Sequence, residues 1–302
     1  MRGKLTFFFI YVTIFASKTK ERPFVRPHRE RTKSHAMNIL TAINKKYLPY
    51  FAAMIRSFAD HNPGEHTIYI ATKEVTGEDI EAYREYFPSG LTFCPVSFCD
   101  DILEGAPTER RWPKEIYYRI FAAGFLPETV DRILYLDSDI IVKGDLSGFY
   151  NTDFEDNFFV ATTNVHSPFL KWFIRVKNGA AKNTVYVNTG VLLMNLKKLR
   201  EEQDHDEVLR YIARRKFFLM LPDQDVISTL YGHKIKIEDG YVYNLNERKI
   251  RGWNRRHGRK GKIGPEWVEK HAKVLHYIGR NKPWNEKYRG ILKPYYDRYR
   301  VK

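Results

Sequence analysis

Residues 133–146 read Ile-Leu-Tyr-Leu-Asp-Ser-Asp-Ile-Ile-Val-Lys-Gly-Asp-Leu. The first four residues of this stretch form a short apolar run, which is typical of a buried strand. The run ends in two carboxylates, Asp137 and Asp139, one residue apart. In open α/β sheets, ligands bind beyond the carboxyl ends of the strands. Because hard oxygen ligands suit Mg²⁺ or Mn²⁺ holding phosphate oxygens, the stretch predicts a metal-dependent site for a nucleotide diphosphate.

Apolar strand patterns alternate with helical patterns on both sides of this stretch. Strands are predicted at 38–43, 67–71, 91–98, 158–162, 235–237 and 273–277, and a turn feeding a buried strand at 185–195. Helices are predicted from residue 48 to the stop at Asn62-Pro63-Gly64, at 77–86, 110–125, 168–177 and 196–215, and from Pro222 onward. Such alternation predicts an α/β fold with a mostly parallel sheet covered by helices on both faces.

The composition limits the chemical class of the binding partner but does not identify the partner. The chain has 302 residues, 43% of them hydrophobic, as in a globular protein, and a net charge of +15. This charge favours an anionic partner, which can be a phosphate, a nucleic acid or a membrane surface. No nucleic-acid-binding motif is present, so nucleic acid is not predicted. The two cysteines, Cys94 and Cys99, are expected to be ordinary reduced thiols in a reducing compartment.

Residues 1–36 differ from the rest of the chain. A basic start is followed by an apolar run at 5–16 and a polar, basic segment, which imitates a signal peptide. The apolar run is shorter than the ~20 residues that span a bilayer. No clear cleavage site follows, and the more basic flank after the run favours the cytoplasmic side. We therefore expect the folded domain at 37–302, with 1–36 either a weak anchor or sequence upstream of the true start.

The C-terminal part contains two basic segments. Residues 248–262 form a basic, glycine-bearing insertion, which is either a solvated loop or a patch for an anionic acceptor or lipid head groups. The tail at 285–302 is basic and rich in tyrosine. Both segments suggest a cytoplasmic protein with peripheral contact at the inner face of a membrane.

Four motifs, of which the two aspartates form the first, occur in a fixed order along the chain. They are Asp137-Ser-Asp139, Asn188-Thr-Gly190, Leu221-Pro-Asp-Gln-Asp225 and His276-Tyr-Ile-Gly-Arg-Asn-Lys-Pro-Trp284. An Asp-x-Asp alone is weak, whereas the last motif is far more specific. With these motifs the chain resembles the family 8 retaining glycosyltransferases, which include lipopolysaccharide galactosyl- and glucosyltransferases and glycogenin. The resemblance covers about residues 37–284.

The resemblance implies a Rossmann-like nucleotide-diphospho-sugar transferase fold of the GT-A type. It further implies transfer of a hexose from a UDP-sugar to a glycan or lipid-linked saccharide, with Mn²⁺ or Mg²⁺ and with retained configuration. Asp137, Asp139 and His276 would hold the metal. The donor would be bound by the following residues: Ala42, Asn44, Arg119, Asp137, Ser138, Asn188, Thr189, Gly279 and Lys282.

The same resemblance places Gln224 on the reactive face of the sugar, with Asp223 beside it. Because a neutral amide is a poor nucleophile, front-face attack is expected in place of a covalent intermediate on Gln224. The family often carries acidic residues in the turn after the first strand, where this chain has Asn44-Lys45-Lys46. That difference leaves the identity of the base open, although Ala42 and Asn44 can bind it through backbone and amide groups.

Two other functions fit part of the pattern. A metal-dependent phosphohydrolase would use Asp137 as its nucleophile, but that class usually has Thr or Val where this chain has Ile141. A non-catalytic nucleotide-sugar-binding protein would not need intact metal ligands. Structural explanations also exist for single residues: Asn188 as a turn residue, Asp223 as a helix cap and His276 as a core histidine.

Overall fold

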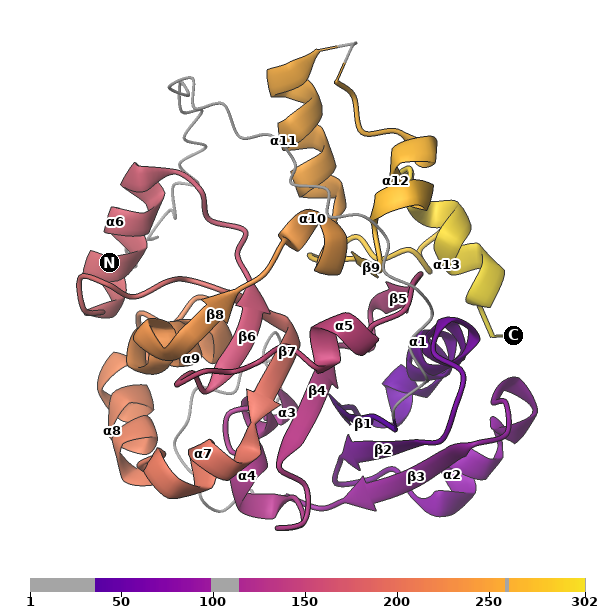
Figure 1. Cartoon of the computed structure of the whole chain (residues 1–302), viewed down its shortest axis with the longest axis horizontal. Coiled ribbons are helices and arrows are strands. Elements are labelled where there is room, and N and C mark those ends of the chain that lie inside the picture. The colour runs from indigo at the N-terminus through magenta and orange to yellow at the C-terminus, as the bar shows by residue number, and fades with distance from the viewer. Residues whose placement is uncertain (1–35, 99–113, 259–260, 302) are drawn as a thin grey trace, which may run out of the picture. The chain divides into compact units, whose positions relative to one another are not determined.

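The computed structural model describes residues 36–98, 114–258 and 261–301, and Figure 1 shows their arrangement. The strands are β1 (Asn38–Ala42), β2 (His66–Ala71), β3 (Leu91–Val96), β4 (Arg132–Leu136), β5 (Ile140–Val142), β6 (Phe159–Thr162), β7 (Asn188–Asn195), β8 (Ile235–Ile237) and β9 (Val274–His276). The longer helices are α1 (Leu48–His61), α6 (Pro168–Asn178), α8 (His205–Arg215), α9 (Pro222–Tyr231) and α11 (Glu247–His257). The shorter helices are α2 (Gly77–Glu81), α3 (Glu115–Tyr118), α4 (Ala122–Phe125), α5 (Ser147–Tyr150), α7 (Leu196–Glu202), α10 (Gly240–Tyr243), α12 (Pro265–His271) and α13 (Lys293–Tyr299).

Seven strands form one mixed sheet in the order β3-β2-β1-β4-β7-β6-β8. The pairs β2–β3, β1–β2, β1–β4 and β6–β8 are parallel, and β7 is antiparallel to both of its neighbours. The predicted mostly parallel sheet is thus confirmed. A second, two-stranded sheet joins β5 to β9.

Helices cover both faces of the large sheet, as its strand sequences require. In β4, Leu134 and Leu136 point into one hydrophobic cluster, which also contains Phe51 of α1. Ile133 and Tyr135 point into the opposite cluster, which is formed with α3, α4, α7, α8 and α9. Successive side chains of a strand alternate between faces, so an uninterrupted apolar run is what a doubly covered strand needs.

Several predicted helices are shorter in the structure. The helix predicted at 196–215 is wrong as one element: α7 and α8 are separated at Gln203 and Asp204. The Asp204 carboxylate accepts a hydrogen bond from the Glu207 backbone N–H and so begins α8 as its N-cap. The helix predicted at 110–125 consists of α3 and α4 where it is described, and residues 110–113 lie outside the described ranges.

Both basic C-terminal segments contain helices, α11 in the insertion and α13 in the tail. The insertion contributes residues 248–257 to α11, which Asn246 caps by accepting from two backbone N–H groups. In the tail, Tyr288, Tyr296 and Tyr299 are buried in the core. Within the described ranges, no helix has both the length and the apolar character to cross a membrane. Residues 1–35 and Cys99 lie outside those ranges.

Candidate functional site

The turn between β4 and β5 carries both aspartates of the opening stretch. β4 ends at Leu136, and β5 begins at Ile140 and leaves the large sheet to pair with β9. In that antiparallel pairing His276 lies opposite Ile140, and the Tyr277 N–H donates to the Asp139 backbone carbonyl. Pairing between strands that are far apart in sequence therefore places an imidazole beside two carboxylates.

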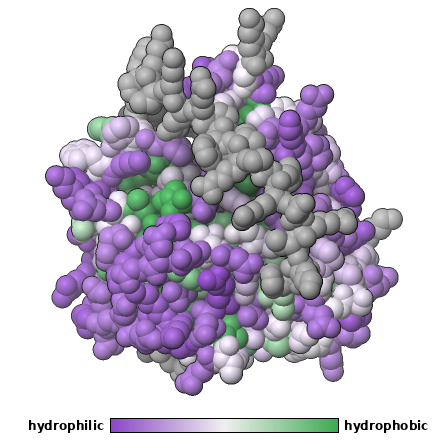
Figure 2. Space-filling view, in the orientation of Figure 1, coloured by the Kyte–Doolittle hydropathy of each residue, from purple (hydrophilic) through white to green (hydrophobic). Residues whose placement is uncertain are grey.

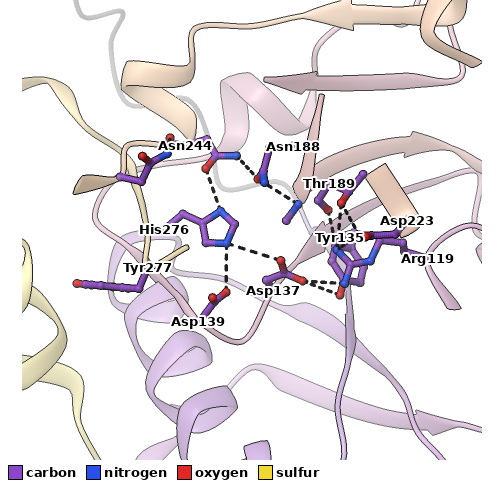
Figure 3. A network of polar contacts seen from close by, with 12 residues as sticks. Arg119, Tyr135, Asp137, Asp139, Asn188, Thr189, Asp223, Asn244, His276 and Tyr277 are labelled. Atoms are coloured by element: carbon purple, nitrogen blue, oxygen red, sulfur yellow. Dashed lines mark hydrogen bonds and ion pairs between the residues drawn. The ribbon is translucent and has the colours of Figure 1, made fainter. Parts of the chain in front are cut away.

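Asp137, Asp139 and His276 converge on one point (Figure 3). One ligand atom from each residue lies within 4.8 Å of the others. His276 Nε2 is 3.2 Å from Asp139 Oδ1 and 3.7 Å from Asp137 Oδ2. Burial alone would raise the pKa of Asp139, but the Lys282 ammonium and the His276 ring hold that pKa well below its usual range. Two carboxylate oxygens and an imidazole nitrogen are a donor set that suits Mn²⁺.

Gly190 provides the space in which these side chains meet. Its carbonyl accepts a 2.9 Å hydrogen bond from the Asp137 backbone N–H, because β7 runs beside β4. A Cβ at this position would clash with the His276 ring and with the Asp137 carboxylate. The glycine of Asn188-Thr-Gly190 is therefore required by close approach.

A chain of hydrogen bonds determines which nitrogen of His276 is free. The Gly190 backbone N–H donates to Asn188 Oδ1 over 3.3 Å, so that oxygen is an acceptor. Asn244 Nδ2 therefore donates to it over 2.7 Å, which leaves Asn244 Oδ1 to accept from the His276 Nδ1–H over 2.9 Å. The Nε2 lone pair of His276 consequently faces the two aspartates. Asn244 is fully buried, and no motif in the sequence indicates it.

Arg119 lies on the other side of Asp137 and is buried. Its guanidinium is 2.9 Å from Asp137 Oδ1 and 3.1 Å from Asp223 Oδ2, and it donates to the Thr189 carbonyl over 3.2 Å. It also lies over the Tyr135 ring, 4.1 Å from the centroid. Burial would lower the pKa of Arg119, but the two carboxylates and the nearby Tyr135 raise it. Arg119 thus joins α3 to the aspartate turn and to α9.

Asp223, at the start of α9, belongs to the same buried network. It accepts a 2.5 Å hydrogen bond from the Thr189 hydroxyl in addition to its ion pair with Arg119. Burial raises the pKa of Asp223 above its usual value, against the effects of Arg119 and Thr189. Gln224 follows it and is partly exposed, and Ser138 is buried within the aspartate turn.

Asp225 holds the start of α9 in place. Its carboxylate is fully buried and accepts hydrogen bonds from Asn178, Tyr186 and the backbone N–H groups of Met220 and Leu221. It also lies 3.2 Å from Lys177 Nζ. Asp225 therefore connects the end of α6 to the segment that leads into α9.

The segment after β9 brings a cation to the metal-ligand cluster. Lys282 Nζ forms an ion pair with Asp139 Oδ2 and donates to the Tyr277 carbonyl over 2.9 Å. Burial would lower the pKa of Lys282, but Asp139 raises it. Gly279 has a φ of 93°, a left-handed conformation that favours glycine.

The turn after β1 borders the cluster on a further side. Asn44 Oδ1 is buried and has no hydrogen-bond partner among the described residues. Lys45 pairs with Asp79 over 2.9 Å, away from Asp139. Tyr47 is 39% exposed, and its hydroxyl interacts electrostatically with Lys282 and Asp139. Ala42 is the last residue of β1. Tyr47 was not predicted as a site residue, although it follows directly after the predicted turn.

Comparisons with known proteins agree with this geometry. The chain is 23% identical over 273 residues to a lipopolysaccharide 1,2-glucosyltransferase of Escherichia coli, covering 88% of this chain and 77% of that protein. It is 24% identical to a lipopolysaccharide 1,3-galactosyltransferase of Salmonella typhimurium, covering 85% and 76% of the two chains. The crystal structure of galactosyltransferase LgtC with donor and acceptor sugar analogs has the same fold. Its TM-score is 0.70 at 22% identity, covering 87% of this chain and 94% of LgtC.

The family assignment rests on the whole catalytic region. Residues 38–288 match the glycosyl transferase family 8, and this range contains the four ordered motifs and the complete seven-stranded sheet. The predicted family and GT-A-like fold are confirmed. The protein belongs to glycosyl transferase family 8 and is a glycosyltransferase.

Proposed function

We propose that the protein transfers a hexose from a UDP-sugar to a saccharide or lipid-linked saccharide, with retained anomeric configuration. The observation that carries this proposal is the convergence of Asp137, Asp139 and His276 at the carboxyl end of the central strand. In a family 8 fold, this is where a nucleotide diphosphate would bind. The similar lipopolysaccharide transferases support a hexose donor and a surface-glycan acceptor.

The three residues fit a divalent cation, Mn²⁺ or Mg²⁺. Their donor atoms are hard or borderline, they lie close together, and the space above Gly190 admits no side chain. Such an ion would neutralise charge on the diphosphate of the donor. Within the chain itself, Asn244 and Asn188 orient His276, and Arg119 orients Asp137.

Replacing Asn244 with leucine should weaken Mn²⁺ binding by about ten- to a hundredfold, because the buried His276 Nδ1–H loses its acceptor. Mn²⁺ titration followed by electron paramagnetic resonance measures the affinity. Asn244→Asp is the matched control, since it keeps an acceptor for Nδ1–H and should retain more affinity than the leucine variant. Equal Mn²⁺ affinity in the leucine variant and the parent would contradict the assigned tautomer.

The donor nucleotide would be held between the turn after β1 and the segment after β9. Asn44 Oδ1 is a buried oxygen that lacks a partner in the described part of the chain, and the Tyr47 ring is exposed beside it for stacking on a base. Ala42 would contribute backbone contacts. Gly279 would allow close approach of the backbone to the diphosphate, and Lys282 would bind it as a point charge.

The chemical step that best fits these residues is front-face attack. The acceptor hydroxyl oxygen bonds to the anomeric carbon while the bond from that carbon to the phosphate oxygen breaks, and the hydroxyl proton passes to the departing phosphate. Gln224 would bind the sugar, and Asp223, held by Arg119 and Thr189, would help to position the sugar. Ser138, Asn188 and Thr189 would line the same pocket. A phosphohydrolase with Asp137 as nucleophile is less well supported, because Asp137 Oδ1 already accepts from Tyr135 and pairs with Arg119.

Thermal-shift measurements with nucleotide sugars test the proposal. With Mn²⁺ present, UDP-galactose or UDP-glucose should stabilise the protein more than GDP-mannose does, and slow release of UDP should accompany binding. Stabilisation by GDP-mannose alone would contradict a uridine donor. Phosphatase activity on a generic phosphoester without turnover of any UDP-sugar would instead support the phosphohydrolase.

Lys282→Ala should separate donor binding from metal binding. Because Lys282 pairs with Asp139, its removal should leave Mn²⁺ affinity unchanged or higher. Loss of one charge-assisted contact should weaken UDP binding by about tenfold or more. Isothermal titration with Mn²⁺ and then with UDP measures both affinities, and Lys293→Ala, in the C-terminal tail, is the control. Unchanged UDP affinity would remove Lys282 from the donor site.

We further propose that 37–302 is the catalytic domain and 1–36 a leader. A cytoplasmic protein with peripheral contact at the inner membrane face fits the basic charge of the chain and its similarity to a lipopolysaccharide glucosyltransferase. Nucleic acid is not among the proposed partners.

A further inference from the structure

The outer side of α6 presents an apolar stripe. Phe169, Trp172, Phe173 and Val176 recur at the spacing of one helical face and are 53, 52, 48 and 57% exposed. Among the residues of α6, all of which are described, Asn178 alone is buried. The helix is nevertheless well terminated, with Ser167 as its N-cap and Gly179, in a left-handed conformation, after its end. A stable helix that turns its apolar stripe outward has a binding role as its simplest explanation.

A second exposed apolar segment lies beside the end of α6. Phe217, Phe218 and Met220 are 87, 56 and 64% exposed. Lys177 of α6 donates to the Phe218 carbonyl over 3.2 Å, and the buried Asp225 carboxylate binds both segments. We call the exposed side chains of α6 and of residues 217–220 the α6 face.

Basic residues accompany these apolar side chains, and acidic residues are absent from both segments of sequence. Residues 163–186 contain Lys171, Arg175, Lys177 and Lys182 and no Asp or Glu. Residues 208–222 contain four arginines and lysines and again no acid. A second copy of this chain would therefore bring like charges together, so self-association through the α6 face is disfavoured.

A cavity of about 330 Å³ lies between α6, residues 180–186 and β8. Its lining includes Lys171, Arg175 and Lys182, together with Asn178, whose buried Oδ1 lacks a hydrogen-bond partner within the described ranges. Figure 2 shows strongly hydrophobic surface, bordered by hydrophilic surface, in the region where Figure 1 draws α6 and β8. The cations beside apolar surface match a phosphate head group beside acyl chains.

We propose that the α6 face is a docking surface for an anionic lipid bilayer. Phe and Trp side chains enter the boundary between head groups and acyl chains, while the lysines and arginines contact lipid phosphates. Because Asp225 joins this face to the start of α9, docking would hold the site close to the membrane surface. Delivery of a lipid-linked acceptor to that site rests on the proposed function, but the docking itself does not.

Vesicle binding by the full chain tests this surface. The parent should bind vesicles of phosphatidylglycerol mixed with phosphatidylcholine, bind phosphatidylcholine alone far more weakly, and lose affinity as salt rises. Trp172→Ser/Phe173→Ser should weaken binding to the mixed vesicles by about tenfold or more. Lys171→Gln/Arg175→Gln should weaken it by about tenfold. In both variants, UDP-sugar hydrolysis without vesicles should equal that of the parent, so a failure of docking and a failure of the proposed function are distinguishable.

Matched controls locate the contact. Ile291→Ser removes an exposed apolar side chain of the tail, and Arg255→Gln/Arg256→Gln removes two exposed charges of α11; both should bind as the parent does. Brominated lipids should quench the parent's tryptophan emission, and most of that quenching should disappear in Trp172→Phe. If Trp172 is not quenched while the protein is vesicle-bound, or if only the α11 variant loses binding, the assignment of the α6 face is overturned.

Discussion

Asp139→Asn is expected to lower Mn²⁺-dependent turnover by at least about a thousandfold while leaving the fold intact. Asp139 supplies a carboxylate oxygen 3.2 Å from His276 Nε2 and is the ion-pair partner of Lys282. The asparagine amide has the same shape but no negative charge, and it places its N–H groups near other donors such as the Lys282 ammonium. Because the side chain is 12% exposed and keeps its size, the circular dichroism spectrum and the cooperative unfolding transition should persist.

Asp145→Asn is the matched control for that substitution, since Asp145 belongs to the same sequence stretch. Its carboxylate accepts from the Ser147 N–H and hydroxyl, away from the metal-ligand cluster. We expect this variant to be less stable by about 1 kcal/mol and to turn over at the parent rate. Initial rates measured across a range of Mn²⁺ concentrations compare the two variants. Turnover at the parent rate in Asp139→Asn would show that the metal assignment is wrong.

Arg119→Met is expected to destabilise the fold by about 3 kcal/mol or more at pH 8, because it leaves one buried and one half-buried carboxylate without their shared cation. The affected carboxylates are Asp137 and Asp223, at 2.9 and 3.1 Å from the guanidinium. Urea unfolding measures the loss. Donor binding should weaken as well, since Asp137 and Thr189 are both positioned by Arg119.

The pH dependence of that loss identifies its cause. Burial already raises the pKa of Asp223 in the folded protein, and removing Arg119 raises it further. Between the unfolded value of about 4 and the raised folded pKa, the folded state binds more protons than the unfolded state. The stability of the folded state therefore falls as pH rises. The free energy of unfolding that Arg119→Met loses relative to the parent should accordingly be smaller at pH 5 than at pH 8.

Arg200→Met is the control for this comparison. Arg200 donates to backbone carbonyls, including those of Pro127 and Val130, and has no carboxylate partner among the described residues. Its substitution should cost stability by an amount that does not change between pH 5 and pH 8. A deficit of Arg119→Met that is likewise constant with pH would indicate lost packing in place of unpaired charge.

Local sequence patterns predicted the strands of the large sheet well, because their apolar runs are long and both faces of the sheet are covered. They did not predict β5, three residues that become a strand only by pairing with β9. They also merged α7 and α8, since the apolar periodicity continues across the cap at Asp204. For the basic insertion, the sequence left two alternatives, a solvated loop or a patch for an anionic partner. In the structure it contains a helix capped by Asn246, which its basic composition did not indicate.

The three residues that the motifs indicated as metal ligands converge in the structure: Asp137 and Asp139 lie in the turn between β4 and β5, and His276 is the last residue of β9. The sequence did not indicate Asn244, and it did not indicate which side chains Arg119 contacts. Asn244 has no distinguishing neighbours in sequence, and it matters because a buried imidazole needs an acceptor. Arg119 was expected to contact the donor phosphate or sugar, and in the structure it pairs with Asp137 and Asp223.

The α/β class, the family and the three candidate metal ligands could all be inferred from the sequence. These follow from local periodicity and from residue types at fixed spacing, which a linear chain displays directly. The tautomer of His276, the partners of Arg119 and the outward orientation of the α6 stripe became known only from the folded chain. The reason is physical: hydrogen bonds, ion pairs and exposure belong to atoms brought together by folding, and an amphipathic pattern does not say which of its faces is turned to solvent.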